Sequence, residues 1–230
     1  MEKLGKIYKT DKIYYHGYQR FYEDFLYKYK NKKFNFLEIG MHYGDSMKLW
    51  KEYFKYAKIY GLEIKKEYRE NRIHVVKGDQ NKLEDLQRLI KITKKCDIIL
   101  DDGSHVPKHQ LFSFLFLFEH CLNYGGTYII EDIETSYWKN GHLYGYDINS
   151  GANSSSNIVN IFRKILPIVN REFLTEAKKN KIYKKNPLFK YVLDNISSIN
   201  FGMNCIIIKK MTKEEREIFG DRTYRFKHFL

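Results

Sequence analysis

The sequence predicts a doubly wound α/β fold, in which helices cover both faces of a mostly parallel sheet. The first observation is that short apolar runs alternate with amphipathic stretches of helical spacing from Phe34 onward. The second is that two apolar runs end in acidic pairs, Asp101-Asp102 and Glu131-Asp132. The third is a glycine turn over residues 40–44, directly after the first apolar run. Because ligands bind at the carboxyl ends of strands in such sheets, these segments predict a functional site there.

The elements follow from the spacing of the apolar residues. Strands are expected over residues 34–39, 59–62, 73–76, 97–100 and 127–130. Helices are expected over residues 18–29, 45–56, 65–70, 83–93, 108–122 and 158–173. Two last apolar runs, 196–201 and 205–208, flank Gly202-Met203-Asn204 and predict a β-hairpin. With right-handed crossovers, this gives a seven-stranded sheet that is parallel except for the C-terminal antiparallel hairpin.

We expect one domain over residues 1–230, since this length can bury a large core. Its expected parts are an N-terminal helical segment over the site (1–33), a ligand-binding core (34–210) that includes an insertion or lid (139–195), and a C-terminal tail (211–230).

The composition excludes several classes of protein. A hydrophobic content of 43% with 17% aromatic residues excludes a disordered chain. The longest apolar run, residues 111–118, is far shorter than the ~20 residues that cross a membrane. The first residues lack the apolar stretch of a secretory signal, so we expect a cytoplasmic protein without a membrane partner. Cys96, Cys121 and Cys205 match no zinc or disulfide pattern, and buried free thiols are expected.

The net charge of +13 raises the question of an anionic partner. The basic residues are scattered, and the abundant residue types share codons rich in A and T, so a compositional origin is favoured over nucleic-acid binding.

The glycine turn has the pattern Glu38-x-Gly40-x-x-x-Gly44. Glycines allow a tight turn and close approach of the backbone to a ligand. The spacing differs from the G-x-G-x-x-G pattern of NAD-binding folds. It resembles the first motif of class I S-adenosylmethionine-dependent methyltransferases. The alternative is a tight strand–helix turn without a ligand.

Further cofactor residues are expected at the ends of the following strands. Glu63 ends the second strand, about twenty residues after the turn, where an acid can accept hydrogen bonds from ribose hydroxyls. Asp79 ends the third strand and can face an adenine amino group. Gln80 and Asp101 are assigned to the same cofactor pocket. Glu63 as a solvated strand end is the competing interpretation.

The two acidic pairs predict a metal site. Asp102, Glu131 and Asp132 offer hard carboxylate oxygens, which suit Mg²⁺, or Mn²⁺ or Ca²⁺ in its place, rather than zinc. His105 lies three residues after Asp102 and is the expected general base, since an unperturbed imidazole is mostly neutral at pH 7. The alternatives are helix caps and pairing with nearby lysines for the acids, and a structural role for His105.

A family resemblance adds to this interpretation. The chain resembles the metal-dependent sugar O-methyltransferases of macrolide and tetracenomycin biosynthesis in these strings: Thr10-Asp11-Lys12, His16-Gly17-Tyr18, Tyr22-Glu23, Asp101-Asp102-Gly103-Ser104-His105 and Glu131-Asp132-Ile133-Glu134-Thr135-Ser136-Tyr137-Trp138. The resemblance implies a Rossmann-like class I methyltransferase fold. It also implies Asp102, Glu131 and Asp132 as Mg²⁺ ligands and His105 as the base, with Glu38, Gly40 and Glu63 lining the cofactor.

The expected function is Mg²⁺-dependent methyl transfer from S-adenosylmethionine to a sugar hydroxyl, with S-adenosylhomocysteine as product. The acceptor is a deoxysugar, a nucleotide-sugar or a glycan, and a homo-oligomer is possible. The alternatives are an O-methyltransferase of a small phenol or catechol, an RNA methyltransferase, and a non-catalytic scaffold with the same fold.

Two groups of aromatic residues have open roles in this interpretation. His16, Tyr18 and Tyr22 share one helix face and either cover the site or pack on the core. Tyr137 and Trp138 either line the acceptor pocket or serve ordinary packing.

Overall fold

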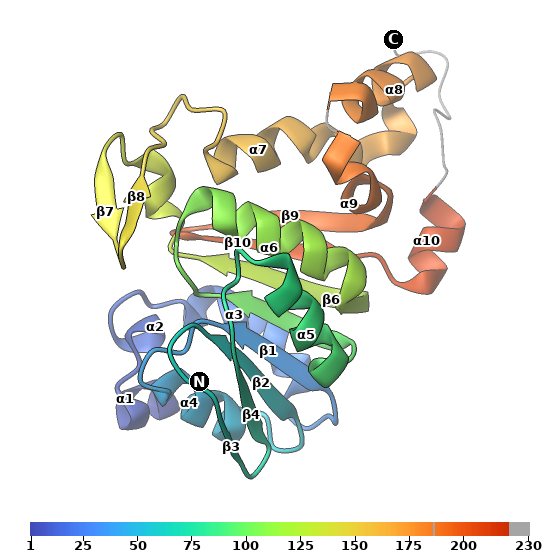
Figure 1. The fold of residues 1–230 in the computed structure, drawn as a ribbon. Coiled ribbons are helices and arrows are strands. Elements are labelled where there is room, and N and C mark those ends of the chain that lie inside the picture. Colours follow the sequence, from blue (N-terminus) through green and yellow to red (C-terminus); the bar gives the residue numbers. More distant parts are fainter. Residues whose placement is uncertain (186, 221–230) are drawn as a thin grey trace.

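The computed structural model describes residues 1–185 and 187–220 and is built around an eight-stranded sheet (Figure 1). The strand order is β3-β4-β2-β1-β5-β6-β10-β9. The strands are β1 (Asn35–Ile39), β2 (Lys58–Glu63), β3 (Tyr68–Glu70), β4 (Ile73–Lys77), β5 (Cys96–Asp101), β6 (Leu122–Glu131), β9 (Ile196–Gly202) and β10 (Cys205–Lys210). A separate small hairpin consists of β7 (Gly141–Leu143) and β8 (Tyr146–Ile148).

The seven predicted strands are confirmed, with the predicted directions. Strands β4, β2, β1, β5 and β6 pair in parallel. Strand β10 is antiparallel to both β6 and β9. The carboxyl ends of the parallel strands therefore meet along one side, which we call the carboxyl edge.

The helix expected over residues 65–70 is wrong. This segment contains β3, an eighth strand that pairs antiparallel with β4 at the end of the sheet. A two-residue turn joins the strands, and its second residue, Arg72, has a left-handed φ of 61°. The Arg72 side chain donates hydrogen bonds to the carbonyl oxygens of Lys51, Phe54 and Ala57, which secures the turn against the end of α4.

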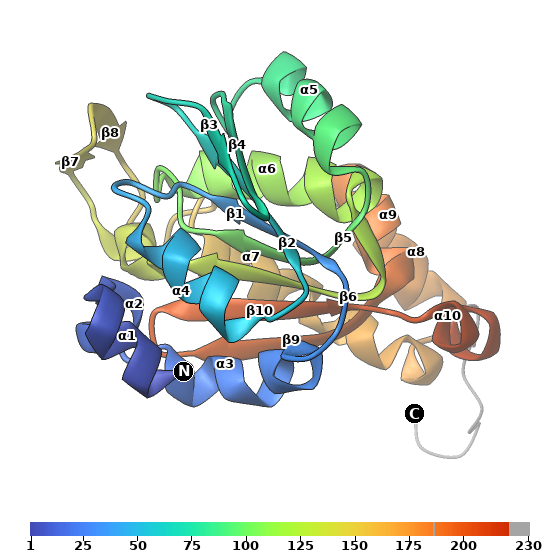
Figure 2. The same ribbon diagram turned by 90° about the horizontal axis from the view of Figure 1, so that it is seen from below.

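The helices form a layer on each face of the sheet (Figures 1 and 2). They are α1 (Glu2–Tyr8), α2 (Asp11–Tyr14), α3 (Gln19–Leu26), α4 (Asp45–Tyr53), α5 (Leu83–Thr93), α6 (Pro107–His120), α7 (Ile158–Ile165), α8 (Glu176–Lys185), α9 (Lys190–Asn195) and α10 (Lys213–Phe219). The 3-10 helices are η1 (Tyr27–Tyr29), η2 (Ile133–Tyr137), η3 (Leu166–Phe173) and η4 (Pro187–Phe189).

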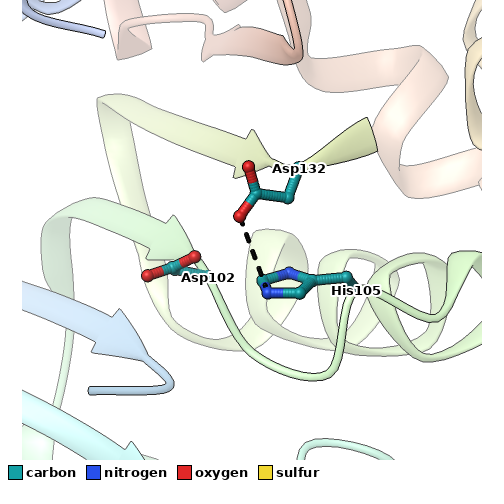
Figure 3. Close-up of side chains that lie close together, drawn as sticks. All are labelled: Asp102, His105 and Asp132. Atoms are coloured by element: carbon teal, nitrogen blue, oxygen red, sulfur yellow. Dashed lines mark ion pairs between the residues drawn. The ribbon is translucent and has the colours of Figure 1, made fainter. Parts of the chain in front are cut away.

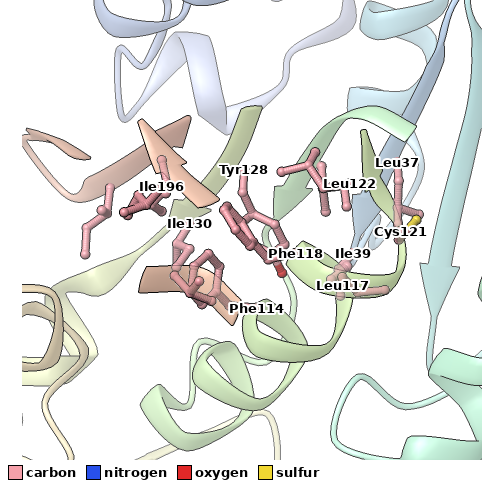
Figure 4. Close-up of a cluster of buried hydrophobic side chains, with 14 of the residues drawn as sticks. Leu37, Ile39, Phe114, Leu117, Phe118, Cys121, Leu122, Tyr128, Ile130 and Ile196 are labelled. Atoms are coloured by element: carbon pink, nitrogen blue, oxygen red, sulfur yellow. The ribbon is translucent and has the colours of Figure 1, made fainter. Parts of the chain in front are cut away.

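Alternation along the strands divides the core into two. Leu37 and Tyr128 face the layer of α5, α6, α7 and α9, whereas Phe36 and Ile129 face the layer of α3 and α4. Figure 4 shows part of the first core, in which the ring of Phe114 from α6 packs against the rings of Tyr128 from β6 and Phe118 from α6. Both faces of the parallel strands are therefore covered, as such sheets require.

Three further expectations can be compared with the structure. Cys96, Cys121 and Cys205 are buried free thiols, as predicted. Of the tail over 211–230, residues 221–230 lie outside the described part of the chain. Within the described part, no helix is both long enough and apolar enough to cross a membrane.

Candidate functional site

The carboxyl edge brings the predicted segments together through the register of three neighbouring strands. Ile39 of β1 pairs with Asp101 of β5, and Asp101 pairs with Ile130 of β6. The residues that follow these pairs, which include Asp102 and Glu131, therefore leave the sheet at the same level. The backbone N–H of Asp102 donates to the carbonyl oxygen of Ile39 at 2.9 Å, which holds the two loops side by side.

Asp102, His105 and Asp132 form one compact group at this edge (Figure 3). One ligand atom from each lies within 4.8 Å of the others. Nε2 of His105 lies 3.6 Å from Oδ2 of Asp132. Asp102 follows β5, Asp132 follows β6, and His105 lies on the loop that leads into α6. The structure thus brings the predicted base next to two of the predicted metal ligands.

Two members of this group have an unusual backbone. His105 has a φ of 56° and Asp132 a φ of 51°, in the left-handed region that few non-glycine residues occupy. The Thr135 hydroxyl donates to the carbonyl oxygen of His105 at 2.5 Å and holds the two loops together. Among the described residues, nothing hydrogen-bonds to Nδ1 of His105, although the side chain is buried. A buried polar atom without a partner is uncommon in folded proteins and often marks a functional residue.

The ammonium group of Lys12 lies among three carboxylates of the same edge. It contacts Asp102, lies 2.5 Å from Oε2 of Glu131, and lies 3.3 Å from Oε1 of Glu38. Lys12 belongs to α2, and its side chain is only 2% exposed. Burial alone would lower the pKa of Lys12, but the three acids outweigh it and raise the pKa well above its usual value. Lys12 therefore stays charged inside the protein.

Glu131 is completely buried, and both of its carboxylate oxygens are engaged. Oε2 binds Lys12, and Oε1 accepts a hydrogen bond from the Tyr22 hydroxyl. Glu131 lies outside the compact group of Asp102, His105 and Asp132, so its role as a metal ligand stays a prediction. Burial raises the pKa of Glu131 to about 8, although Lys12 offsets part of this effect.

Asp132 is held by two residues from distant parts of the chain. The Tyr18 hydroxyl donates to Oδ1 of Asp132 at 2.5 Å, and the Asn204 amide donates to the same oxygen at 2.9 Å. Nδ1 of His16 lies 3.8 Å from this oxygen. His16 and Tyr18 precede α3, so the prediction that they share one helix face with Tyr22 is wrong. All three side chains nevertheless point at the acidic residues, and the two tyrosines are at the same time buried in the core.

The donor set suits a hard divalent cation. Carboxylates from neighbouring strand ends converge with one histidine and no thiolate within the described site, which favours Mg²⁺ over zinc. Burial raises the pKa of Glu38 to about 7, despite Lys12, which lowers it in part. Together with the raised pKa of Glu131, this indicates that the ammonium group of Lys12 does not balance all the negative charge of the carboxylates at this edge.

The glycine turn lies beside this group. Gly40 has a φ of 75°, and a Cβ atom there would lie 2.1 Å from the carbonyl oxygen of Asp102. Gly44 has a φ of 93° and directly precedes α4, so both glycines are required by the backbone. Glu38, the last residue but one of β1, is buried and accepts a hydrogen bond from the Ser46 hydroxyl at 2.8 Å. The turn therefore links the expected cofactor side of the edge to Asp102.

The next two predicted cofactor residues lie at the carboxyl ends of β2 and β4. Glu63 is buried, and its carboxylate accepts hydrogen bonds from the backbone N–H groups of Met41 and Lys65. Asp79 is half-buried and accepts one from the N–H of Asn81. Their contact with a cofactor stays a prediction.

Gln80 and Asp101 are bonded to each other and to the loop that carries His105. The Gln80 amide donates to both carboxylate oxygens of Asp101 at 3.1 Å, and its carbonyl accepts from the N–H of Ser104 at 2.7 Å. The Ser113 hydroxyl donates to Asp101 at 2.7 Å. Burial raises the pKa of Asp101 to about 6, against these hydrogen bonds. The arrangement supports the loop, and a direct cofactor contact of either residue stays a prediction.

Tyr144, which the sequence did not single out, also lies beside the compact group. Tyr144 lies at the tip of the β7–β8 hairpin with a φ of 52°, and its ring centroid lies 5.6 Å from that of His105. The side chain is 66% exposed. Tyr137 is also exposed, whereas a Cβ atom on Gly141 would lie 2.5 Å from the Trp138 ring, so Trp138 packs against the base of the hairpin.

The amino-acid sequence is similar to those of several characterised enzymes. No family model matches the chain. The mycinamicin VI 2''-O-methyltransferase of Micromonospora griseorubida is 31% identical over 215 residues, which cover 89% of this chain and 53% of the relative. The 8-demethyl-8-alpha-L-rhamnosyl tetracenomycin-C 2'-O-methyltransferase of Streptomyces olivaceus is 36% identical over 138 residues, 56% of this chain and 36% of the relative. The chain is homologous to the macrolide and tetracenomycin sugar O-methyltransferases.

The whole of this chain has the same fold as part of a solved methyltransferase structure. The MycE methyltransferase of the mycinamycin biosynthetic pathway, in complex with Mg and SAH, superimposes with a TM-score of 0.81 at 27% identity. The match covers 100% of this chain and 57% of MycE, and the class I methyltransferase fold is thereby established. The chain spans about half the length of the curated sugar O-methyltransferases that it matches.

Several residues of the site were not predicted from the sequence. The string Thr10-Asp11-Lys12 contributed to the resemblance, but nothing local showed that Lys12 would be buried among acids. Asn204 was expected only as part of a turn, and Tyr144 lies in the insertion without any motif. The Tyr144-Gly145 tip is a turn signal that could have located the hairpin.

Proposed function

We propose that this chain transfers a methyl group from S-adenosylmethionine to a sugar hydroxyl with the help of a divalent cation, Mg²⁺ by preference. The observation that carries the proposal is the compact group of Asp102, His105 and Asp132 in direct contact with the glycine turn at Gly40. Homology to enzymes named for sugar O-methylation, over 89% of this chain for one of them, supports the choice of acceptor.

The proposed roles follow from the positions of the side chains. Asp102 and Asp132 would hold the cation, and Glu131 remains a predicted third ligand. A bound cation would make a coordinated sugar hydroxyl more acidic, because it stabilises the alkoxide. The turn at Gly40 and Gly44, with Glu38, Glu63, Asp79, Gln80 and Asp101, would form the cofactor side, and S-adenosylmethionine would supply the methyl group and leave as S-adenosylhomocysteine.

His105 is proposed as the general base. Its imidazole would accept the hydroxyl proton as the oxygen attacks. Asp132, whose Oδ2 lies 3.6 Å from Nε2, would then stabilise the imidazolium charge. The buried backbone around His105, fixed by Thr135, keeps the ring in place for this step.

Tyr144 is proposed as an acceptor contact. Its exposed ring beside His105 offers a flat apolar surface of the kind that packs against a sugar ring. This arrangement has room for a free sugar, a nucleotide-linked sugar or a glycoside, because the Tyr144 side chain at the hairpin tip is exposed to solvent.

The test begins with calorimetric titration of S-adenosylhomocysteine and of Mg²⁺ into the wild type and Asp102→Asn. We expect the wild type to bind both and the variant to lose Mg²⁺ binding. Methyl transfer to a rhamnoside, a nucleotide-linked rhamnose, catechol and a structured RNA is then measured side by side. Transfer to either sugar supports the proposal.

Two outcomes would contradict the proposal in different ways. A wild type that binds no S-adenosylhomocysteine is not a methyltransferase. Transfer to catechol or RNA alone would retain the methyltransferase and replace the acceptor.

A further inference from the structure

The N-terminal segment supplies an outer layer of polar groups around the acidic residues. Lys12 binds Asp102 and Glu131, Tyr22 binds Glu131, and Tyr18 binds Asp132. These partners are 90 or more residues apart in the chain, and all the donors come from residues 12–22. In metal sites, outer partners of this kind orient the ligands and tune the affinity.

Lys12 is the charged member of this layer and the one that reaches three strand ends. Its ammonium group donates hydrogen bonds to Oδ2 of Asp102 and Oε2 of Glu131. It also lies 3.3 Å from Oε1 of Glu38 on the proposed cofactor side. The buried carboxylates of Glu38 and Glu131 and the partly buried one of Asp102 would repel one another without it. The side chain is thus placed to keep these acids at a fixed separation.

We propose that Lys12 is a positioning residue of the metal site: it fixes Asp102 and Glu131 so that a divalent cation can bind beside Asp102 and Asp132. This inference rests on the proposed function. In this role the ammonium group of Lys12 connects the N-terminal segment to both the proposed cofactor side and the proposed metal side of the edge.

The charges are compatible with Lys12 and a metal ion at the same time. Glu38, Asp102, Glu131 and Asp132 contribute four carboxylates. A divalent cation, the Lys12 ammonium group and the single net positive charge of S-adenosylmethionine would together balance them. The charge of Lys12 is therefore needed to balance the four carboxylates when both the metal ion and the cofactor are bound.

A rival role predicts the opposite effect on metal affinity. If Lys12 merely occupied the place of the metal ion, its removal would free Asp102 and Glu131 and add one net negative charge, so the cation would bind more tightly. If Lys12 positions the ligands, its removal lets the acids move apart or take up protons, and the cation binds more weakly. The direction of the change decides between the two roles.

The experiment is titration calorimetry of Mg²⁺, without cofactor, into the wild type, Lys12→Met and Lys12→Arg. Lys210→Met is the matched control, because Lys210 is as buried as Lys12 but, within the described part of the chain, donates to the carbonyl oxygens of Phe118 and Leu122 instead of the acids. We expect Lys12→Met to bind Mg²⁺ about 10-fold or more weakly. Lys12→Arg should retain more of the affinity than Lys12→Met, and Lys210→Met should match the wild type. Thermal unfolding confirms that each variant is folded at the titration temperature.

Unchanged or tighter Mg²⁺ binding by Lys12→Met would overturn the inference, as would equal losses in Lys12→Met and Lys210→Met. If Lys12→Met does not fold, Tyr22→Phe removes only the hydroxyl that holds Glu131 and should still weaken Mg²⁺ binding; no change there would overturn the role of the outer layer. A wild type that binds no Mg²⁺ would contradict the proposed metal site itself, which separates the two failures.

Discussion

Gly40 and Asp102 meet backbone to backbone: a Cβ atom on Gly40 would lie 2.1 Å from the Asp102 carbonyl oxygen. The contact joins the glycine turn after β1 to the acidic loop after β5. The proposed cofactor side and the proposed metal side of the carboxyl edge are therefore held at one fixed distance, with no side chain between the two backbones.

This contact predicts a large cost for Gly40→Ala. The substitution adds both a steric clash and a left-handed alanine, so we expect the free energy of unfolding to fall by at least ~2 kcal/mol. Gly145→Ala is the matched control, since its φ of 87° is also left-handed but no atom lies within 4 Å of the added Cβ. Urea unfolding of both variants measures the difference, and equal losses would show that the Asp102 contact has no energetic role.

Replacement of the proposed base should act on turnover rather than on cofactor binding. For His105→Gln we expect kcat to fall ~10²–10⁴-fold, the range typical of general-base catalysis, with little change in the Kd of S-adenosylhomocysteine. Kinetics at saturating cofactor and calorimetry of the product provide the two readouts. A variant with wild-type turnover would exclude His105 as the base.

Removal of the metal should separate cofactor binding from transfer. After dialysis against EDTA we expect methyl transfer to be lost and to return on addition of Mg²⁺, because Asp102 and Asp132 offer oxygen ligands. S-adenosylhomocysteine binding should persist in the stripped protein. Full activity in the presence of the chelator would contradict the metal site.

Truncation of the hairpin tip should affect the acceptor alone. Tyr144→Ala removes an exposed ring beside His105, and we expect the KM for the sugar acceptor to rise ~5–30-fold, the loss of one aromatic contact of ~1–2 kcal/mol. Tyr56→Ala is a suitable control, because Tyr56 is also exposed but precedes β2 at the opposite edge of the sheet. Equal effects of the two variants would remove Tyr144 from the acceptor site.

The buried Lys210 should make stability depend on pH. Burial lowers the pKa of Lys210 to about 8, below the ~10.4 of an unfolded lysine. Between pH 8 and pH 10 the unfolded chain therefore binds more protons at this residue, so the free energy of unfolding should rise with pH, by ~1–2 kcal/mol. Lys210→Met lacks this contribution, and unfolding of both proteins at pH 8 and pH 10 isolates it. The same pH dependence in both would assign it to other groups.

The sequence predicted the fold well because the strands are buried on both faces and the helices between them are strongly periodic. Residues 83–93 were predicted as a helix and form α5 over that range. The failure at residues 65–70 has a physical cause. The segment is charged and lacks an apolar stripe, and β3 exists only because its backbone pairs with β4 beyond the turn at Arg72.

The candidate site was predictable only where strand ends carry its residues. Asp102 and Asp132 follow β5 and β6, so the topology alone brings them together. Lys12 reaches the same place from a helix before the sheet, and Asn204 reaches it from the turn between β9 and β10. Such contacts depend on how whole segments pack, and no local pattern in the chain reports them.

His105 and Asp132 are held in left-handed backbone conformations that only glycine adopts without cost. Glycine at these two positions would relieve the backbone strain but would remove the side chains proposed to carry the chemistry. Engineers who aim for a hardier catalyst should keep both residues fixed and seek improvement elsewhere in the molecule.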